Sequence, residues 1–206
     1  MSTIAWPGTA PFVAARWESG YDANVFVSQS PLSGDVQSVA IPGDRFRARV
    51  TIPAGTHAER AQLEGLFASL RCSQTFSANR LQIWHLARPT PRGTVSGSPT
   101  VQAVAAQLTT SVSITTPSAG MTFLRGDMIG FPNQTCIVTA DATANGSSIA
   151  TVSIAAPLRS ALAIGDAVTL TQPKMLMLVV GMPMWGYDPG SVGTDQVTID
   201  LMEVFA

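Results

Sequence analysis

The chain has 206 residues, of which 46% are hydrophobic and 12% charged, with 12 basic against 13 acidic side chains and a formal net charge of -1. This length suits one large β-rich domain or two small ones. The charged fraction is well below the roughly 25% of an ordinary soluble protein, so much of the surface must be uncharged, which favours assembly. The charge balance excludes nucleic-acid binding by bulk electrostatics, because neutralising phosphates needs a positive excess.

Targeting, membrane and redox signals are weak in this sequence. Residues 1–15 contain no basic residue and are interrupted by two prolines and a glycine, unlike a secretory signal. The longest apolar run, Met175 to Val180, is far short of the roughly 20 residues of a membrane helix. We therefore expect a soluble chain without membrane insertion. Cys72 and Cys136 lack a CxxC spacing and are expected to be reduced thiols that bind no metal.

Charge divides the chain into three zones. Residues 1–93 hold nine arginines against six carboxylates, residues 94–173 are nearly uncharged, and residues 174–206 hold one lysine against four carboxylates. We predict that 1–93 and 174–206 form one domain and that 94–173 is a small β-module inserted between two of its strands. Contacts between subunits would explain the complementary charges equally well.

The first zone predicts a strand, a helix and a second strand. Residues 45–52 alternate between polar and apolar side chains, the period of a strand with one buried face. Thr56 and Glu59 have the spacing of a capping box, followed by an apolar stripe with helical spacing. The stripe consists of Leu63, Leu66, Phe67 and Leu70. Residues 81–87 alternate again and end before Pro89 and Pro91.

The second zone predicts short strands separated by turns, and the third zone ends in strands. The expected strands are 111–115, 128–131, 135–139, 149–154, 167–171, 175–180 and 197–201. Asn145-Gly146 predicts a hairpin turn, because both residues tolerate positive φ. Gly126-Asp127 and Gly165-Asp166 predict equivalent turns leading into strands of a small barrel. Residues 156–162 suggest one helical turn, and the uninterrupted apolar run 175–180 suggests a strand buried on both faces.

These elements predict a mainly β fold: a β-sandwich or barrel-like domain with one packed α-helix, plus a small inserted β-barrel module. No constellation of catalytic residues accompanies it. His57 and His85 have no Cys, Asp or Glu at metal-ligand or triad spacing, so we expect structural roles for both. Asp188, Asp195 and Asp200 lie close together, but we assign them to a turn, a loop and the solvent face of a strand rather than to glycoside hydrolysis. We expect no enzyme activity, no cofactor and no metal site.

Three short motifs that match functional patterns are better explained as turns. Arg125-Gly126-Asp127 spells an adhesion tripeptide but coincides with the turn predicted before Met128. Asn133-Gln134-Thr135 and Asn145-Gly146-Ser147 match the glycosylation acceptor pattern, which has no use without secretion. We interpret all three as turns.

Residues that favour contacts between subunits are more prominent. Arg45, Arg47 and Arg49 lie on one face of the predicted strand and could pair with carboxylates of a neighbour, although a solvated face would look the same. Trp185 and Tyr187 are flanked by Pro and Gly, where aromatic rings often anchor interfaces. Other aromatic residues with such flanks are Trp6, Trp17 and Tyr21, which could equally close the core. Eleven of the twelve basic residues are arginine, which tolerates interfaces better than lysine.

Several segments together resemble the distal tail protein, a tail-tip or baseplate ring protein of long-tailed bacteriophages. These are Arg45–Arg60, Arg80–Leu86, Arg92–Thr94 and Thr198–Phe205, with Gly126-Asp127 and Ala156–Ala161 similar to small β-modules inserted in tail-tip proteins. The resemblance implies a ring, commonly sixfold, of β-sandwich domains that continues the tail tube at its tip, while the extra module points outward. It carries over no site residue.

The resemblance further implies a structural virion protein of the tail tip, assembled in the cytoplasm of a bacterial host. Its implied partners are other copies of itself, the tail tube protein, the tail hub and fibre or other tip proteins, without sequence-specific binding of nucleic acid. A ring subunit needs two different complementary surfaces, and a weakly charged surface suits this requirement. Two alternatives stay open: a carbohydrate-binding β-sandwich that stacks sugars on Trp185 and Tyr187, and another tail ring, such as a tube or terminator protein.

Overall fold

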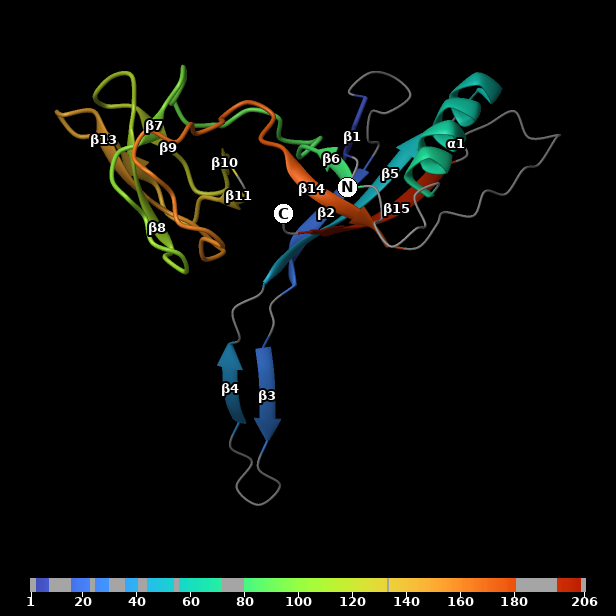
Figure 1. Cartoon of the computed structure of the whole chain (residues 1–206), viewed down its shortest axis with the longest axis horizontal. Coiled ribbons are helices and arrows are strands. Elements are labelled where there is room, and N and C mark those ends of the chain that lie inside the picture. The colour runs from blue at the N-terminus through green and yellow to red at the C-terminus, as the bar shows by residue number, and fades with distance from the viewer. Residues whose placement is uncertain are drawn as a thin grey trace.

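The structure is a computed structural model. It describes residues 3–7, 16–22, 25–29, 36–40, 44–53, 56–71, 80–132, 134–180 and 196–204, and every structural statement below refers to these. Within them the chain is mainly β with one helix, as predicted (Figure 1).

Six strands form one mixed sheet in the order β1-β6-β14-β15-β5-β2. They are β1 (Thr3–Ala5), β2 (Arg16–Asp22), β5 (Arg45–Pro53), β6 (Arg80–Ile83), β14 (Met175–Val179) and β15 (Gln196–Glu203). Only the pairing of β1 with β6 is parallel among them. The two strands from the C-terminal part of the chain, β14 and β15, therefore lie side by side in the middle of the sheet, with β6 paired to β14 and β5 paired to β15.

The best-specified part of the sequence folds as predicted. Inward-facing residues of β5 are almost completely buried, and its arginines face outward. Helix α1 (His57–Arg71) begins with the predicted capping box, in which Glu59 N donates to Thr56 Oγ1 at 3.3 Å and Thr56 N donates to Glu59 Oε2 at 2.9 Å. Leu63 and Phe67 of α1 join the core on the inner face of the sheet. The helix therefore covers the face where a sandwich would place a second sheet.

Two other strand predictions need correction. The strand expected over 81–87 ends at Ile83, and residues 86 and 87 form a turn. Strand β14 buries Met175 and Met177 but leaves Leu176, Leu178 and Val179 only half-buried. It is not buried on both faces, because the described residues place a core on only one side of the sheet.

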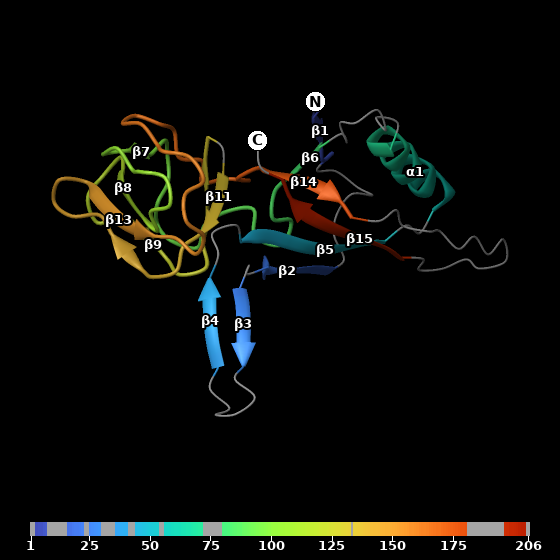
Figure 2. The same ribbon diagram turned by 60° about the horizontal axis from the view of Figure 1, so that its bottom comes forward.

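Strands β3 (Val25–Gln29) and β4 (Val36–Ala40) form a separate two-stranded sheet, which we call the arm. The arm continues the antiparallel ribbon of β2 and β5, with Asp22 opposite Arg45 in the sheet and Val25 opposite Ala40 in the arm. Figures 1 and 2 show that it projects away from the six-stranded sheet, α1 and the remaining strands.

Residues 94–173, here called the insert, form three small sheets. These contain β7 (Thr100–Val101), β8 (Ser111–Thr115), β9 (Thr122–Phe123), β10 (Met128–Phe131), β11 (Gln134–Ile137), β12 (Ala142–Thr143) and β13 (Ile149–Ser153), arranged as β10-β11, β12-β9 and β13-β8-β7. The described strands close no barrel. The strand expected over 167–171 consists of isolated bridges at Ala167 and Thr169.

The helical turn expected over 156–162 is not formed. Leu158 N instead donates to Thr109 O, and Leu162 N donates to Ala105 O, both at 2.9 Å. These two backbone donors are therefore bonded to a distant segment and not to carbonyls of a local helix.

The two Gly-Asp turns of the insert are equivalent, as predicted. Gly126 and Gly165 have φ values of +91° and +87°, which a residue with a side chain rarely adopts. In each turn the aspartate carboxylate accepts a bond from the residue three positions earlier: Leu124 N at 2.9 Å for Asp127, and Ala163 N at 2.8 Å for Asp166.

The hairpin turn at Asn145-Gly146 is also confirmed, but by a different mechanism. Asn145 N donates to Ile149 O, and Asn145 Oδ1 accepts from Ser147 N and Ile149 N. The positive φ of +59° is at Ser148.

The insert has a hydrophobic cluster of its own and also contacts the cluster of the sheet. Eighteen buried residues form its cluster, among them Phe123, Ile129 and Val152. Met128 belongs instead to the sheet cluster, and Ile137 is packed against it. The insert therefore rests on the inner face of the sheet, although the predicted domain boundaries themselves stay a prediction.

Candidate subunit interface

The outer face of the six-stranded sheet, opposite the core, carries the predicted arginine row. Because side chains alternate along β5, Arg45, Arg47 and Arg49 all point to this face while Phe46 and Ala48 point to the core. The structure thus brings the three arginines together. Whether a neighbouring subunit contacts them stays a prediction.

Carboxylates on both flanking strands pair with these arginines. Arg49 binds Asp200 of β15 through two bonds, Nε to Oδ1 at 2.6 Å and Nη2 to Oδ2 at 3.2 Å. Arg47 Nη2 lies 2.5 Å from Oδ2 of Asp22 in β2. The bond from Arg49 lowers the pKa of Asp200. All four side chains are at least half exposed, and exposed ion pairs contribute only about 0–1 kcal/mol. These ion pairs therefore add little to the stability of the fold. Because they are exposed, the same side chains are free to form ion pairs with another subunit instead.

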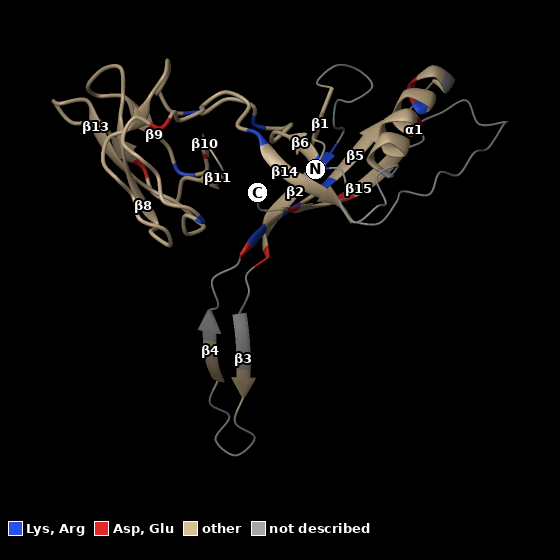
Figure 3. Ribbon diagram, viewed as in Figure 1, with Lys and Arg blue, Asp and Glu red and all other residues tan. Residues whose placement is uncertain are grey.

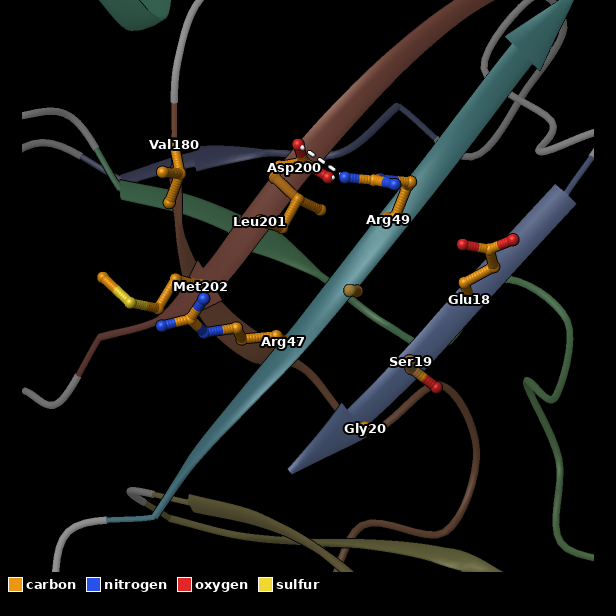
Figure 4. Close-up of a pocket in the computed structure, with 10 residues that line it drawn as sticks. Glu18, Ser19, Gly20, Arg47, Arg49, Val180, Asp200, Leu201 and Met202 are labelled. Carbon is orange, nitrogen blue, oxygen red and sulfur yellow. Dashed lines mark hydrogen bonds and ion pairs between the residues drawn. The ribbon is translucent and has the colours of Figure 1, made fainter. Parts of the chain in front are cut away.

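A groove of about 450 Å³ runs across this face between β2, β5 and β15. Gly20 stands directly opposite Arg47, and a Cβ at Gly20 would meet nothing within 4 Å. The missing side chain leaves space beside Arg47. Figure 4 shows Arg49 between Asp200 on one side and Glu18 on the other. Charged side chains of both signs therefore line this part of the groove.

One end of the groove is apolar. Val180 is 48% exposed, and its backbone N donates to Asp200 O at 2.8 Å. Met202, opposite Leu178 in the register of β14 and β15, is half-buried and also lines the groove. A charged half and an apolar half thus share one surface, a combination common in protein interfaces.

Sequence reasoning missed Gly20, Val180 and Met202. The apolar run 175–180 predicts a doubly buried strand that includes Val180, and nothing local indicates that Gly20 faces Arg47. Their positions follow from the register of β2, β5 and β15, which sequence periodicity does not supply. Alternation along the chain could have indicated Val180 alone, and the uniformly apolar sequence of residues 175–180 hides it.

The aromatic candidates have different outcomes. Trp185 and Tyr187 lie outside the described residues, as do Asp188 and Asp195. Those near the start belong to the core of the sheet: Trp6 is 2% exposed, and Trp17 and Tyr21 are packed against the same cluster. Burial raises the pKa of the Tyr21 hydroxyl.

His85 occupies a structural position next to the sheet. It is 2% exposed and lies in the segment after β6 rather than in a strand. Its ring centroid is 4.8 Å from that of Trp17, and its Nδ1 accepts a bond from Arg88 N at 3.1 Å. Burial, followed by the charge of Arg88, lowers the pKa of His85 to about 4. The folded chain therefore holds the His85 ring in its neutral form. The side chain of His57 lies outside the described set.

The short motifs are parts of the fold where they are described. Asp127 of the adhesion-like tripeptide is 3% exposed, and its carboxylate accepts bonds from Arg92 N at 2.8 Å and Gly93 N at 3.1 Å. Asp200 lies on the solvent face of β15, as expected. Asn133 is outside the described residues, and Thr135 is buried in β11. Cys136 is a buried free thiol, while Cys72 is not described.

Within the described part of the chain, no group of three or more His, Cys, Asp or Glu side chains is arranged to hold a metal ion. The same residues include no helix with the length and apolar character needed to cross a membrane. Charged residues lie mainly along the six-stranded sheet and its connections to the insert, while much of the insert is uncharged (Figure 3). No protein-family model matches the chain, and no curated protein matches its sequence.

Proposed function

We propose that this chain is a structural subunit of a ring at the distal end of a bacteriophage tail, where it joins the tail tube to tail-tip proteins. The arm is the observation that carries this proposal. A two-stranded ribbon without further strands beside it is marginally stable in water, and beyond the six-stranded sheet no other described strand is paired with β3 or β4. A neighbouring subunit in a ring would supply the missing support.

The charge of the strands favours the arm as the contact element. Edge strand β2 carries Arg16, Glu18 and Asp22, and charges of this kind protect an exposed edge from pairing with other chains. The sequences of β3 and β4, VFVSQ and VQSVA, contain no charged residue. Val36 of the arm is 62% exposed. An uncharged strand pair of this type is suited to burial in an assembly.

The outer face supplies the second surface that such a ring needs. A closed ring with one subunit type uses two different complementary patches on each subunit. The arm and the outer face lie on different parts of the molecule (Figure 1) and differ in charge. We therefore place subunit contacts at these two surfaces, with the tail tube, hub and fibre proteins above and below the ring.

Mass spectrometry and electron microscopy of purified phage particles test the proposal directly. The chain should be present at the tail tip in the copy number of a ring, and its absence from particles would refute the proposal. Val36→Lys should abolish ring formation and incorporation without lowering the melting temperature of the subunit. Leu108→Lys is the matched control, because Leu108 is similarly exposed, at 56%, but lies on the insert. Equal effects of the two substitutions would exclude the arm as the contact.

A further inference from the structure

The boundary between the insert and the six-stranded sheet contains a buried pair of opposite charges. Glu203 of β15 is 5% exposed and follows Val197, Ile199 and Leu201 on the inner face of the strand. A carboxylate therefore occupies the last position of an apolar row. Buried charges of this kind require partners, because leaving water is costly.

The cationic partner of Glu203 comes from the insert. Arg159 Nη2 lies 3.8 Å from Glu203 Oε2, and the same nitrogen donates to Asp44 O just before β5. Glu203 Oε2 also accepts a bond from Phe46 N at 3.0 Å. The Arg159 side chain is only 19% exposed. One guanidinium thus links the insert to β15 and to the residue that precedes β5.

The surroundings of this pair are polar and incompletely filled. A cavity of about 150 Å³ lies between the insert and the sheet, and its lining includes Gln82, Gln134, Lys174 and Glu203. Thr135 Oγ1 of the insert donates to Lys174 O at 2.9 Å. The cavity is large enough and polar enough to admit water. Apolar contact across this boundary is limited to a few residues, including Met128 and Ile137.

We propose that Arg159 and Glu203 form a polar latch that holds the insert against the sheet and allows it to detach as a folded unit. A joint made by close-packed apolar side chains would be fixed, since its separation would expose all of them to water. In this joint, polar groups and a cavity replace much of that apolar surface. The insert and the sheet each keep a hydrophobic cluster of their own when they separate. The inference does not depend on ring assembly and applies to the single chain.

Distance measurements between the two parts test the latch. Spin labels are attached to cysteines introduced at exposed Gln62 of α1 and exposed Ser147 of the insert, in the full chain with Cys72→Ser. Double electron–electron resonance then measures the distribution of label distances. Arg159→Met and Glu203→Gln each remove one charge and keep a side chain of similar size. Asp200→Asn is the matched control, because Asp200 is a paired carboxylate on the same strand but on the outer face.

We expect a single narrow distribution in the parent protein and in Asp200→Asn. Both latch variants should show a second, displaced population at least tenfold larger than in the parent, with the near-ultraviolet circular dichroism of the folded chain retained. An unchanged distribution in both would overturn the proposal, since apolar contacts would then hold the joint. Cooperative unfolding of the whole chain in both would overturn it equally, because the insert could not then detach as a folded unit.

Discussion

Phe67 of α1 and Arg47 of β5 lie on opposite faces of one sheet and have opposite roles. Phe67 is 2% exposed and shares a cluster with Phe46 and Val50 across the inner face. Replacing Phe67 by alanine should lower the free energy of unfolding by about 3–5 kcal/mol, the usual cost of removing a buried aromatic side chain. Arg47→Ala should change it by no more than about 0.5 kcal/mol, because its ion pair is exposed. Urea unfolding of the isolated subunit measures both values.

If the outer face is a subunit contact, Arg47→Ala should weaken ring formation in mass photometry while the melting temperature is unchanged. Arg125→Ala serves as the control, since this arginine is exposed on the insert. Equally small effects of Phe67→Ala and Arg47→Ala on stability would contradict the assignment of the two sheet faces.

His85 makes stability depend on pH in a defined direction. Its pKa falls from 6.5 to about 4 on folding, so the unfolded chain binds a proton more readily between these values. The free energy of unfolding should therefore decrease as the pH falls from 6.5 towards 4, by up to about 3 kcal/mol. His85→Gln should reduce this decrease, since an amide oxygen can accept the Arg88 N–H without titrating. Chemical unfolding at pH 6.5 and 5 compares the two proteins, and identical slopes would show that the ring is not held neutral.

The pKa of Glu203 is shifted in the opposite direction from that of an ordinary paired carboxylate, whose pKa is lowered. Burial raises its pKa more than Phe46 N and Arg159 lower it. Its ionisation therefore disfavours the folded state as the pH rises above the usual value of the group.

At the level of elements, local signals were predicted well and tertiary ones were not. The alternation of β5 and the capping box of α1 depend on a few adjacent residues, so the sequence was sufficient for them. The half-exposed face of β14 depends on what covers the sheet, which an apolar run cannot reveal. Residues 156–162 are not helical, and the backbone N–H groups of Leu158 and Leu162 donate instead to Thr109 O and Ala105 O, which lie about fifty residues earlier in the chain.

The candidate surfaces show the same division. Alternation alone placed Arg45, Arg47 and Arg49 on one face. Neither the groove beside Gly20 nor the bridge from Arg159 to Glu203 could be found this way, because each joins residues from strands or segments far apart in the chain. The arm was not predicted either, since residues 25–40 contain only short apolar stretches between polar residues.

At the scale of the whole molecule, the two hydrophobic clusters lead to a prediction about truncation. Replacing residues 94–173 by a short Gly-Ser bridge should leave a sheet that unfolds cooperatively, because most of its cluster lies outside the insert. The truncated chain should be less stable than the parent, since Glu203 loses its partner Arg159. Adding Glu203→Gln should recover part of that loss. Thermal unfolding followed by tryptophan fluorescence measures these differences, and absence of any cooperative transition in both truncated chains would show that one shared core exists.

The position of the insert in the sheet has a further consequence. Ile83, the last residue of β6, is directly opposite Met175, the first residue of β14, so everything between them closes a connection whose ends are adjacent. In a flexible connection, each doubling of length adds only about 0.6 kcal/mol to the cost of closure. For the hydrogen-bond ladder, residues 84–174 are therefore equivalent to the loop of a hairpin. A different folded cassette with neighbouring termini could occupy this position while β6 and β14 keep their register, so what the chain displays can change independently of the sheet that carries it.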